Sequence, residues 1–120
     1  MSKVERVLGP GGLVEGRYPG FETRPQQLQM AAAVAKALDR GEELLVEAGT
    51  GVGKTFAYLV PAIQAIASRK DFRVVVSTHT IGLQEQLVTK DIPFLQAAMP
   101  DCKRFVDGEV VETSRRRVRA

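Results

Sequence analysis

The stretch EELLVEAGTGVGKTFAYLV, residues 42–60, decides the fold. It opens with an apolar run at residues 44–46, passes through a turn with glycines at 49, 51 and 53, and continues with helical apolar spacing over residues 55–67. This order predicts a strand, a loop and a helix. The β-branched run Val74, Val75 and Val76, within residues 73–77, predicts a second strand that is covered on both faces of a parallel sheet.

Residues 48–55, AGTGVGKT, have the spacing of the phosphate-binding P-loop, GxxxxGK[ST], with alanine in place of the first glycine. The glycines let successive N–H groups face inward and form an anion nest at the start of a helix. Lys54 is expected to reach the β- and γ-phosphates and Thr55 to bind the bridging Mg²⁺, so these two are the candidate catalytic residues. The alternative is a chance match, which the flanking patterns disfavour. The predicted triphosphate-binding residues of this loop are Ala48, Gly49, Thr50, Gly51, Val52, Gly53, Lys54 and Thr55.

Further helices are predicted on both sides of this unit. Apolar residues recur at helical steps over residues 27–40, with Pro25 ahead and Gly41 behind as start and stop signals. A third helix is expected over residues 81–90, with a bend or restart at 91–93 and helical spacing again at 94–99. Alternating strands and helices predict an α/β fold, a parallel sheet flanked by helices. Residues 1–20 are glycine-rich and predict an irregular lead-in, and residues 101–120 form an unassigned basic tail.

Composition restricts the class of protein only loosely. A chain of 120 residues has room for one domain, and its 44% apolar and 26% charged residues are ordinary for a globular protein. The net charge of +3 does not indicate DNA binding, because the tail has six basic against four acidic side chains and the rest is almost balanced. The sequence has no apolar run that suits a membrane span or a signal peptide, which predicts a cytoplasmic protein. The single cysteine, Cys102, does not support an iron–sulfur cluster.

Three spaced segments carry a resemblance to a known family. They are RPQQ at residues 24–27, the P-loop followed by AYLVPA at 57–62, and STHT at 77–80 leading into LQEQL at 83–87. In this order they resemble the N-terminal part of DinG-like DNA helicases, superfamily 2 enzymes related to the XPD helicases. The resemblance covers roughly residues 8–99. It implies that residues 21–100 are part of a RecA-like first motor domain, incomplete in this chain, that binds ATP.

The resemblance also implies roles for residues outside the P-loop. Gln27 would pair with the adenine edge and select ATP over GTP, and Arg24 would lie beside the base. Thr78, His79 and Thr80 would contact the phosphate backbone of single-stranded DNA or of DNA junctions. The alternatives stay open: Gln27 as a polar residue in a first helical turn, the two threonines as strand-end and N-cap residues, and His79 as a solvated loop residue.

The sequence departs from the family pattern in parts that ATP hydrolysis requires. It has no DEAH-type acidic pair after the P-loop, since Glu42 and Glu43 precede it, and no second motor domain that supplies arginines. The tail also differs from the family pattern, which suggests a truncated coding sequence. Whether this chain is an enzyme is therefore left open, and it is expected to bind Mg–ATP weakly without useful turnover. A small regulatory module that partners a separate ATPase, or a non-functional fragment, are the other readings.

Overall fold

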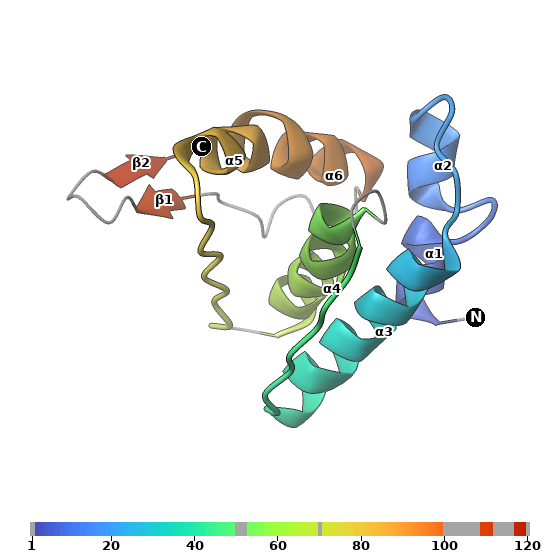
Figure 1. Cartoon of the computed structure of the whole chain (residues 1–120), viewed down its shortest axis with the longest axis horizontal. Helices are drawn as coiled ribbons and strands as arrows, with labels where there is room; N and C mark the ends of the chain where they lie inside the picture. Colours follow the sequence, from blue (N-terminus) through green and yellow to red (C-terminus); the bar gives the residue numbers. More distant parts are fainter. Residues whose placement is uncertain (1, 50–52, 70, 100–108, 112–116, 120) are drawn as a thin grey trace.

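The computed structural model describes residues 2–49, 53–69, 71–99, 109–111 and 117–119. Short helices precede and follow two long helices, and two short strands end the described part of the chain (Figure 1). The elements are α1 (Lys3–Leu8), α2 (Leu13–Arg17), α3 (Pro25–Arg40), α4 (Lys54–Ser68), α5 (Ile81–Gln86), the π-helix η1 (Leu87–Asp91), α6 (Ile92–Ala98), β1 (Glu109–Val111) and β2 (Arg117–Arg119).

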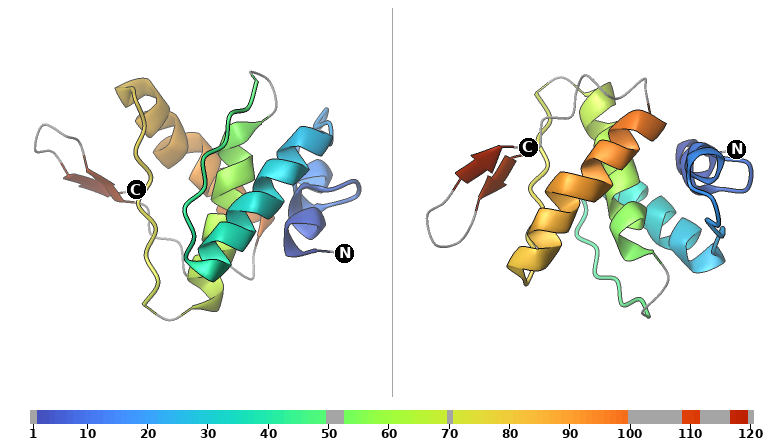
Figure 2. Two further views of the ribbon diagram at one scale, coloured as in Figure 1. Left: turned by 60° about the horizontal axis from the view of Figure 1, so that its bottom comes forward. Right: turned by 90° about the horizontal axis from the view of Figure 1, so that it is seen from above.

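The two long helices, α3 and α4, lie side by side and run in the same direction (Figures 1 and 2). Their first turns meet where Gln27 Nε2 donates to the carbonyl of Gly53, 3.1 Å away. Their last turns meet where Arg69 contacts Leu38 and Asp39. Residues 41–49 therefore lead the chain from the end of α3 back toward the start of α4. Gly41, in the left-handed conformation with φ 66°, ends α3 as its position after the apolar pattern predicted.

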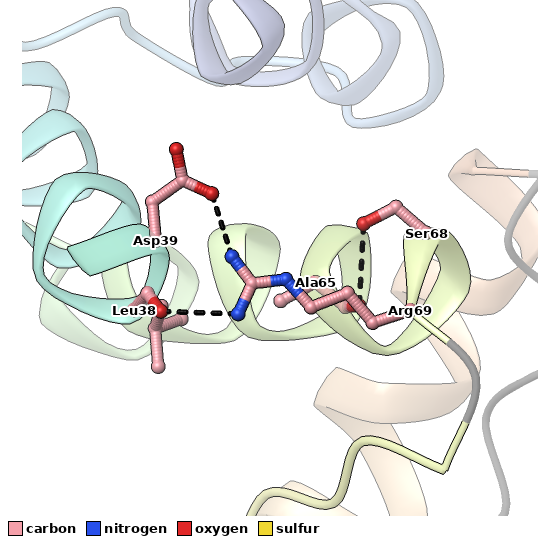
Figure 3. A network of polar contacts seen from close by, with 5 residues as sticks. All are labelled: Leu38, Asp39, Ala65, Ser68 and Arg69. Atoms are coloured by element: carbon pink, nitrogen blue, oxygen red, sulfur yellow. Dashed lines mark hydrogen bonds and ion pairs between the residues drawn. The ribbon is translucent and has the colours of Figure 1, made fainter. Parts of the chain in front are cut away.

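Arg69 joins the C-terminal ends of α3 and α4 (Figure 3). Its Nη1 donates to the carbonyl of Leu38 at 3.1 Å, and its Nη2 lies 2.6 Å from Asp39 Oδ1. The guanidinium also lies over the ring of Phe72, 5.0 Å from the centroid. The carbonyl of Leu38 belongs to the last turn of α3, where carbonyls have no hydrogen-bond partner within the helix. Arg69 therefore supplies a donor for this carbonyl and also forms an ion pair with Asp39.

The lead-in is helical, contrary to the irregular structure that its glycines predicted. Val4, Val7 and Leu8 of α1 and Val14 of α2 are buried in the core. The glycines and proline at residues 9–12 confine the break to the turn between the two helices. Contact of α1 with α3 and α4, and of α2 with α1 and α6, stabilises segments too short to be stable alone. Gln64 Nε2 ties α4 to this layer by donating to the carbonyl of Lys3 at 3.0 Å.

An aromatic cluster holds α6 against the start of α4. The rings of Phe56 and Phe94 stack with centroids 5.7 Å apart, and Tyr18 meets Phe94 edge to face at 5.9 Å. These contacts connect α4, α6 and the residue that caps α2. The π-helix η1 comes just before Pro93, in the region where the sequence predicted a bend. Since proline lacks an N–H and clashes with the preceding turn, a widened turn at this place fits its chemistry.

The parallel sheet predicted from the two apolar runs is not formed by the described residues. Residues 44–46 and 73–77 have no strand assignment, and their backbones pair with no other described segment. Leu45 and Val75 are 98% and 91% exposed instead of buried. The physical reason is that a strand exists only through hydrogen bonds to a neighbour, which an apolar pattern in one segment cannot supply.

The tail forms a short β-ribbon where no regular structure was predicted. Strands β1 and β2 pair antiparallel, with Glu109 opposite Arg119 and Val111 opposite Arg117. Residues 100–108, 112–116 and 120 lie outside the described part of the chain.

Candidate nucleotide-binding site

The predicted phosphate loop ends at the N-terminus of a helix, as the motif requires. Gly53 is the N-cap of α4 in the left-handed conformation, with φ 75° and ψ 47°, and its carbonyl accepts the first helical hydrogen bond, from Ala57 N at 3.2 Å. The side chain of Lys54 is exposed and that of Thr55 is half-buried in the first turn. The unpaired N–H groups and the positive end of the helix dipole make this terminus suitable for an anion.

The rest of the loop is described only in part. Ala48 is half-buried and Gly49 is exposed at the end of the extended segment that leads to α4. Thr50, Gly51 and Val52, three of the predicted phosphate-binding residues, lie outside the described residues. The described geometry therefore concerns the last residues of the loop and the first turn of α4.

Gln27 reaches the loop directly, a contact that the sequence did not predict. It lies in the first turn of α3 and is 2% exposed, which is unusual for a polar side chain. Its Nε2 donates to the carbonyl of Gly53 at 3.1 Å, and its Oε1 is buried and accepts no hydrogen bond from any described residue. The structure thus brings the residue assigned to adenine to the last glycine of the phosphate loop.

Arg24 lies at the same end of the helix pair but is not held in the site. It is the N-cap residue of α3, and its exposed side chain lies 3.7 Å from Glu22 in an ion pair. Exposed pairs of this kind hold side chains weakly. The backbone of Arg24 is therefore fixed at the start of α3, whereas its guanidinium is free to exchange Glu22 for another partner.

Thr55 has a side-chain neighbour that the motif did not indicate. Burial raises the pKa of the Tyr58 phenol, a side-chain hydrogen bond with Thr55 opposes the rise, and the charge of Asp91 adds to it. Tyr58 follows Thr55 by three residues on α4, a spacing at which side chains on a helix meet, so this partner was accessible to sequence reasoning.

The donor set suits a Mg²⁺ that arrives with a triphosphate. The described residues contain no group of three His, Cys, Asp or Glu side chains that would hold a metal by themselves. A single hydroxyl is what a P-loop contributes, because phosphate oxygens and waters complete the octahedral shell of Mg²⁺. Thr55 fits that role.

The segment predicted to contact DNA begins α5. Thr80 is the N-cap residue, and its Oγ1 accepts from the N–H of Leu83 at 3.2 Å. Thr78 Oγ1 donates to the carbonyl of Thr80 at 3.2 Å, and His79 is exposed. The structural alternative for Thr80, an N-cap, is therefore confirmed. No hydrogen bond joins the described residues of this segment to those of the phosphate loop.

A cavity of about 360 Å³ lies at the opposite end of the helix pair, away from the phosphate loop. Its lining includes Lys36, Asp39, Gln64 and Arg69. The candidate nucleotide site is an exposed helix terminus, and none of its residues lines this cavity.

Comparison with known proteins covers the part of the chain that contains Gln27 and the phosphate loop. The profile of the DEAD/DEAH box helicase family matches residues 24–120, which include Gln27, Gly53 and Lys54. The chain belongs to this helicase family. The match extends into the tail, beyond the segment that carried the resemblance in the sequence.

Several similar proteins are named ATP-dependent DNA helicases. The chain is 46% identical over 92 residues to YoaA of Escherichia coli strain K12, a match that covers 77% of this chain and 14% of that protein. It is 46% identical over 92 residues to DinG of the same strain, covering 75% and 13%. It is 38% identical over 98 residues to YoaA of Haemophilus influenzae, covering 82% and 14%.

These matches place the chain within a small part of longer proteins, since it spans 13–14% of the relatives' length. No solved structure matches the chain. Among the described residues, no helix is long and apolar enough to cross a membrane.

Proposed function

We propose that this chain is the ATP-binding segment of the first motor domain of a DinG-like DNA helicase. The observation that carries the proposal is the hydrogen bond from Gln27 to Gly53 at 3.1 Å, which joins the candidate base-recognition residue to the phosphate loop. Two motif segments 26 residues apart in sequence therefore meet at the start of α4, as one nucleotide site requires. Family membership supports the same reading.

In this proposal each residue of the site has a separate task. The N–H groups of the loop, residues 48–53, and the first turn of α4 surround the phosphates, and Lys54 neutralises charge on the β- and γ-phosphates. Thr55 binds Mg²⁺, which requires its hydroxyl to turn from Tyr58 toward the metal. Gln27 reads the adenine edge, and Arg24, whose ion pair with Glu22 is exposed, lies beside the base.

The proposed DNA contact lies at residues 78–80. The exposed start of α5 presents backbone N–H groups and the side chain of His79, and such donors suit phosphate oxygens. The hydroxyl of Thr80 already accepts a hydrogen bond from Leu83 and still has its own proton to donate. The names of the relatives favour DNA as the partner, and the resemblance of the sequence implies a single strand.

Binding without useful hydrolysis is the activity proposed for this chain. The sequence after the P-loop contains no adjacent pair of acidic residues to hold Mg²⁺ and orient an attacking water. Without such a pair, the residues of this chain can retain nucleotide but lack the acids that hold Mg²⁺ and orient the attacking water.

Titration with a fluorescent ATP analogue tests the nucleotide site. The unchanged chain should bind with Mg²⁺ present, and Lys54→Ala should lose most of that affinity. Lys36→Ala, which removes an exposed lysine of α3, is the matched control and should bind normally. Equal affinity of the Lys54→Ala and unchanged proteins would contradict the assignment of the P-loop.

The exposed apolar segments favour a second candidate, a module completed by another polypeptide. Leu45 and Val75 are 98% and 91% exposed. The backbones of their segments form no hydrogen bonds with other described segments. A separate chain that supplies strands, acids and arginines would cover these residues and restore hydrolysis. Mixing the chain with a candidate partner should then produce ATPase activity that neither shows alone, and activity that is merely additive would count against this reading.

A further inference from the structure

The carbonyl of Gly53 accepts two hydrogen bonds, one from each long helix. Ala57 N donates to it at 3.2 Å within α4, and Gln27 Nε2 donates to it at 3.1 Å from α3. A side chain at residue 53 would collide with Gln27 Nε2, because a Cβ built on Gly53 overlaps that atom. Gln27 therefore lies directly against the backbone of the loop.

This contact orients the first free N–H of the helix. The carbonyl of Gly53 and the N–H of Lys54 belong to one planar peptide group, and in a trans peptide they point in opposite directions. No cis peptide occurs in the described chain. Holding the carbonyl toward α3 and the helix interior therefore directs the Lys54 N–H outward from the N-terminus, where a phosphate would bind.

Burial makes the contact a durable one. Gln27 is 2% exposed, so water does not compete for its amide, and breaking the bond would leave a buried donor unsatisfied. One N–H of the amide is used by Gly53, whereas Oε1 is buried and has no hydrogen-bond partner among the described residues, so a contact with adenine would require this amide to become exposed. The hydrogen bond from Gln27 to Gly53 therefore requires no contact with a base.

We infer that Gln27 is a positioning residue for phosphate binding, acting through the Gly53–Lys54 peptide in addition to any contact with adenine. The inference rests on the proposed function, since it concerns the same site. It makes a distinct claim, that loss of the Gln27 amide weakens binding of a ligand that has no base.

Inorganic tripolyphosphate with Mg²⁺ is such a ligand, and calorimetric titration of the full chain measures its affinity. Gln27→Met keeps the size of the side chain and removes the donor. It should weaken tripolyphosphate binding about threefold to tenfold, the range expected for one buried hydrogen bond. ATP affinity should fall by at least the same factor.

Gln64→Met is the matched control, because Gln64 Nε2 also donates to a backbone carbonyl, that of Lys3 at 3.0 Å, but outside the phosphate loop. It should leave tripolyphosphate affinity unchanged. Gln27→Asn is a second variant, in case Gln27→Met fails to fold. Its amide is one methylene too short to reach Gly53, so it should weaken tripolyphosphate binding by the same factor.

The outcomes separate the inference from the function on which it rests. A loss of ATP affinity without a loss of tripolyphosphate affinity in either Gln27 variant would overturn the positioning role and leave a base contact only. A loss in Gln64→Met equal to that in Gln27→Met would overturn it as well, since the effect would then be general. No binding of tripolyphosphate by the unchanged chain, or equal binding by Lys54→Ala, would overturn the proposed function itself.

Discussion

Arg69 and Asp39 approach to 2.6 Å across the C-terminal ends of α3 and α4, and the same guanidinium donates to the carbonyl of Leu38 (Figure 3). The side chain of Asp39 is 80% exposed whereas that of Arg69 is 35% exposed. The hydrogen bond to Leu38 and the contact with Phe72 should therefore stabilise the fold more than the ion pair does.

Replacing Arg69 tests this ranking. Arg69→Met should lower the free energy of unfolding by about 1–2 kcal/mol, because it removes a hydrogen bond to a helix-end carbonyl and a cation–π contact. Asp39→Asn removes only the exposed charge and should lower it by less than about 1 kcal/mol. Urea unfolding followed by circular dichroism measures both, and a larger loss in Asp39→Asn would reverse the ranking.

Thr80 should stabilise α5 as an N-cap. Its Oγ1 accepts from Leu83 N at 3.2 Å, so Thr80→Ala should cost about 1 kcal/mol. Thr80→Ser keeps the hydroxyl and should cost little. If the hydroxyl also contacts DNA, Thr80→Ala should weaken binding of single-stranded DNA at temperatures where the variant is folded. If Thr80→Ala binds single-stranded DNA normally, the role of Thr80 is structural only.

The carboxyl of Asp91 should make stability depend on pH. Burial raises its pKa, while the hydrogen bond from Gln86 and the charge of Lys90 oppose the rise. The folded state therefore binds this proton more tightly than the unfolded state does. The resulting stabilisation is fully present below the ordinary pKa of an aspartate and is lost as pH rises through the raised value.

Asp91→Asn mimics the protonated form and tests this sign. The variant should melt at a higher temperature than the unchanged chain at neutral pH, and the difference should shrink as pH falls toward about 4. If the difference in melting temperature between the two proteins grew as pH fell, the predicted direction of the pH dependence would be wrong.

The exposed apolar segments should promote self-association without stabilising the fold. Leu45→Gln and Val75→Thr change side chains that are 98% and 91% exposed, so the melting temperature should stay within a few degrees while association measured by sedimentation decreases. Leu95→Ala, in the core at 0% exposure, should instead lower the free energy of unfolding by about 2–5 kcal/mol. Strong destabilisation by Val75→Thr would show that residues 73–77 are covered in solution.

Local sequence signals predicted the helices that form the site. Pro25 and Gly41 bracket the predicted helix at 27–40, and the structure has Pro25–Arg40. The helix expected at 55–67 is found as Lys54–Ser68. In contrast, the helices of the lead-in were missed, because segments of five or six residues depend more on packing than on their own propensity: α1 packs against α3 and α4, and α2 against α1 and α6.

The sequence by itself determined that a glycine-rich turn delivers Lys54 and Thr55 to a helix N-terminus, because spacing, glycine conformation and helix periodicity act over a few neighbouring residues. Only the tertiary structure decided that Gln27 contacts Gly53 and that residues 44–46 and 73–77 pair with no other segment among those the structure describes. Both depend on partners distant in sequence: two parallel helices bring the first pair together, and a strand forms only where another segment supplies the hydrogen bonds.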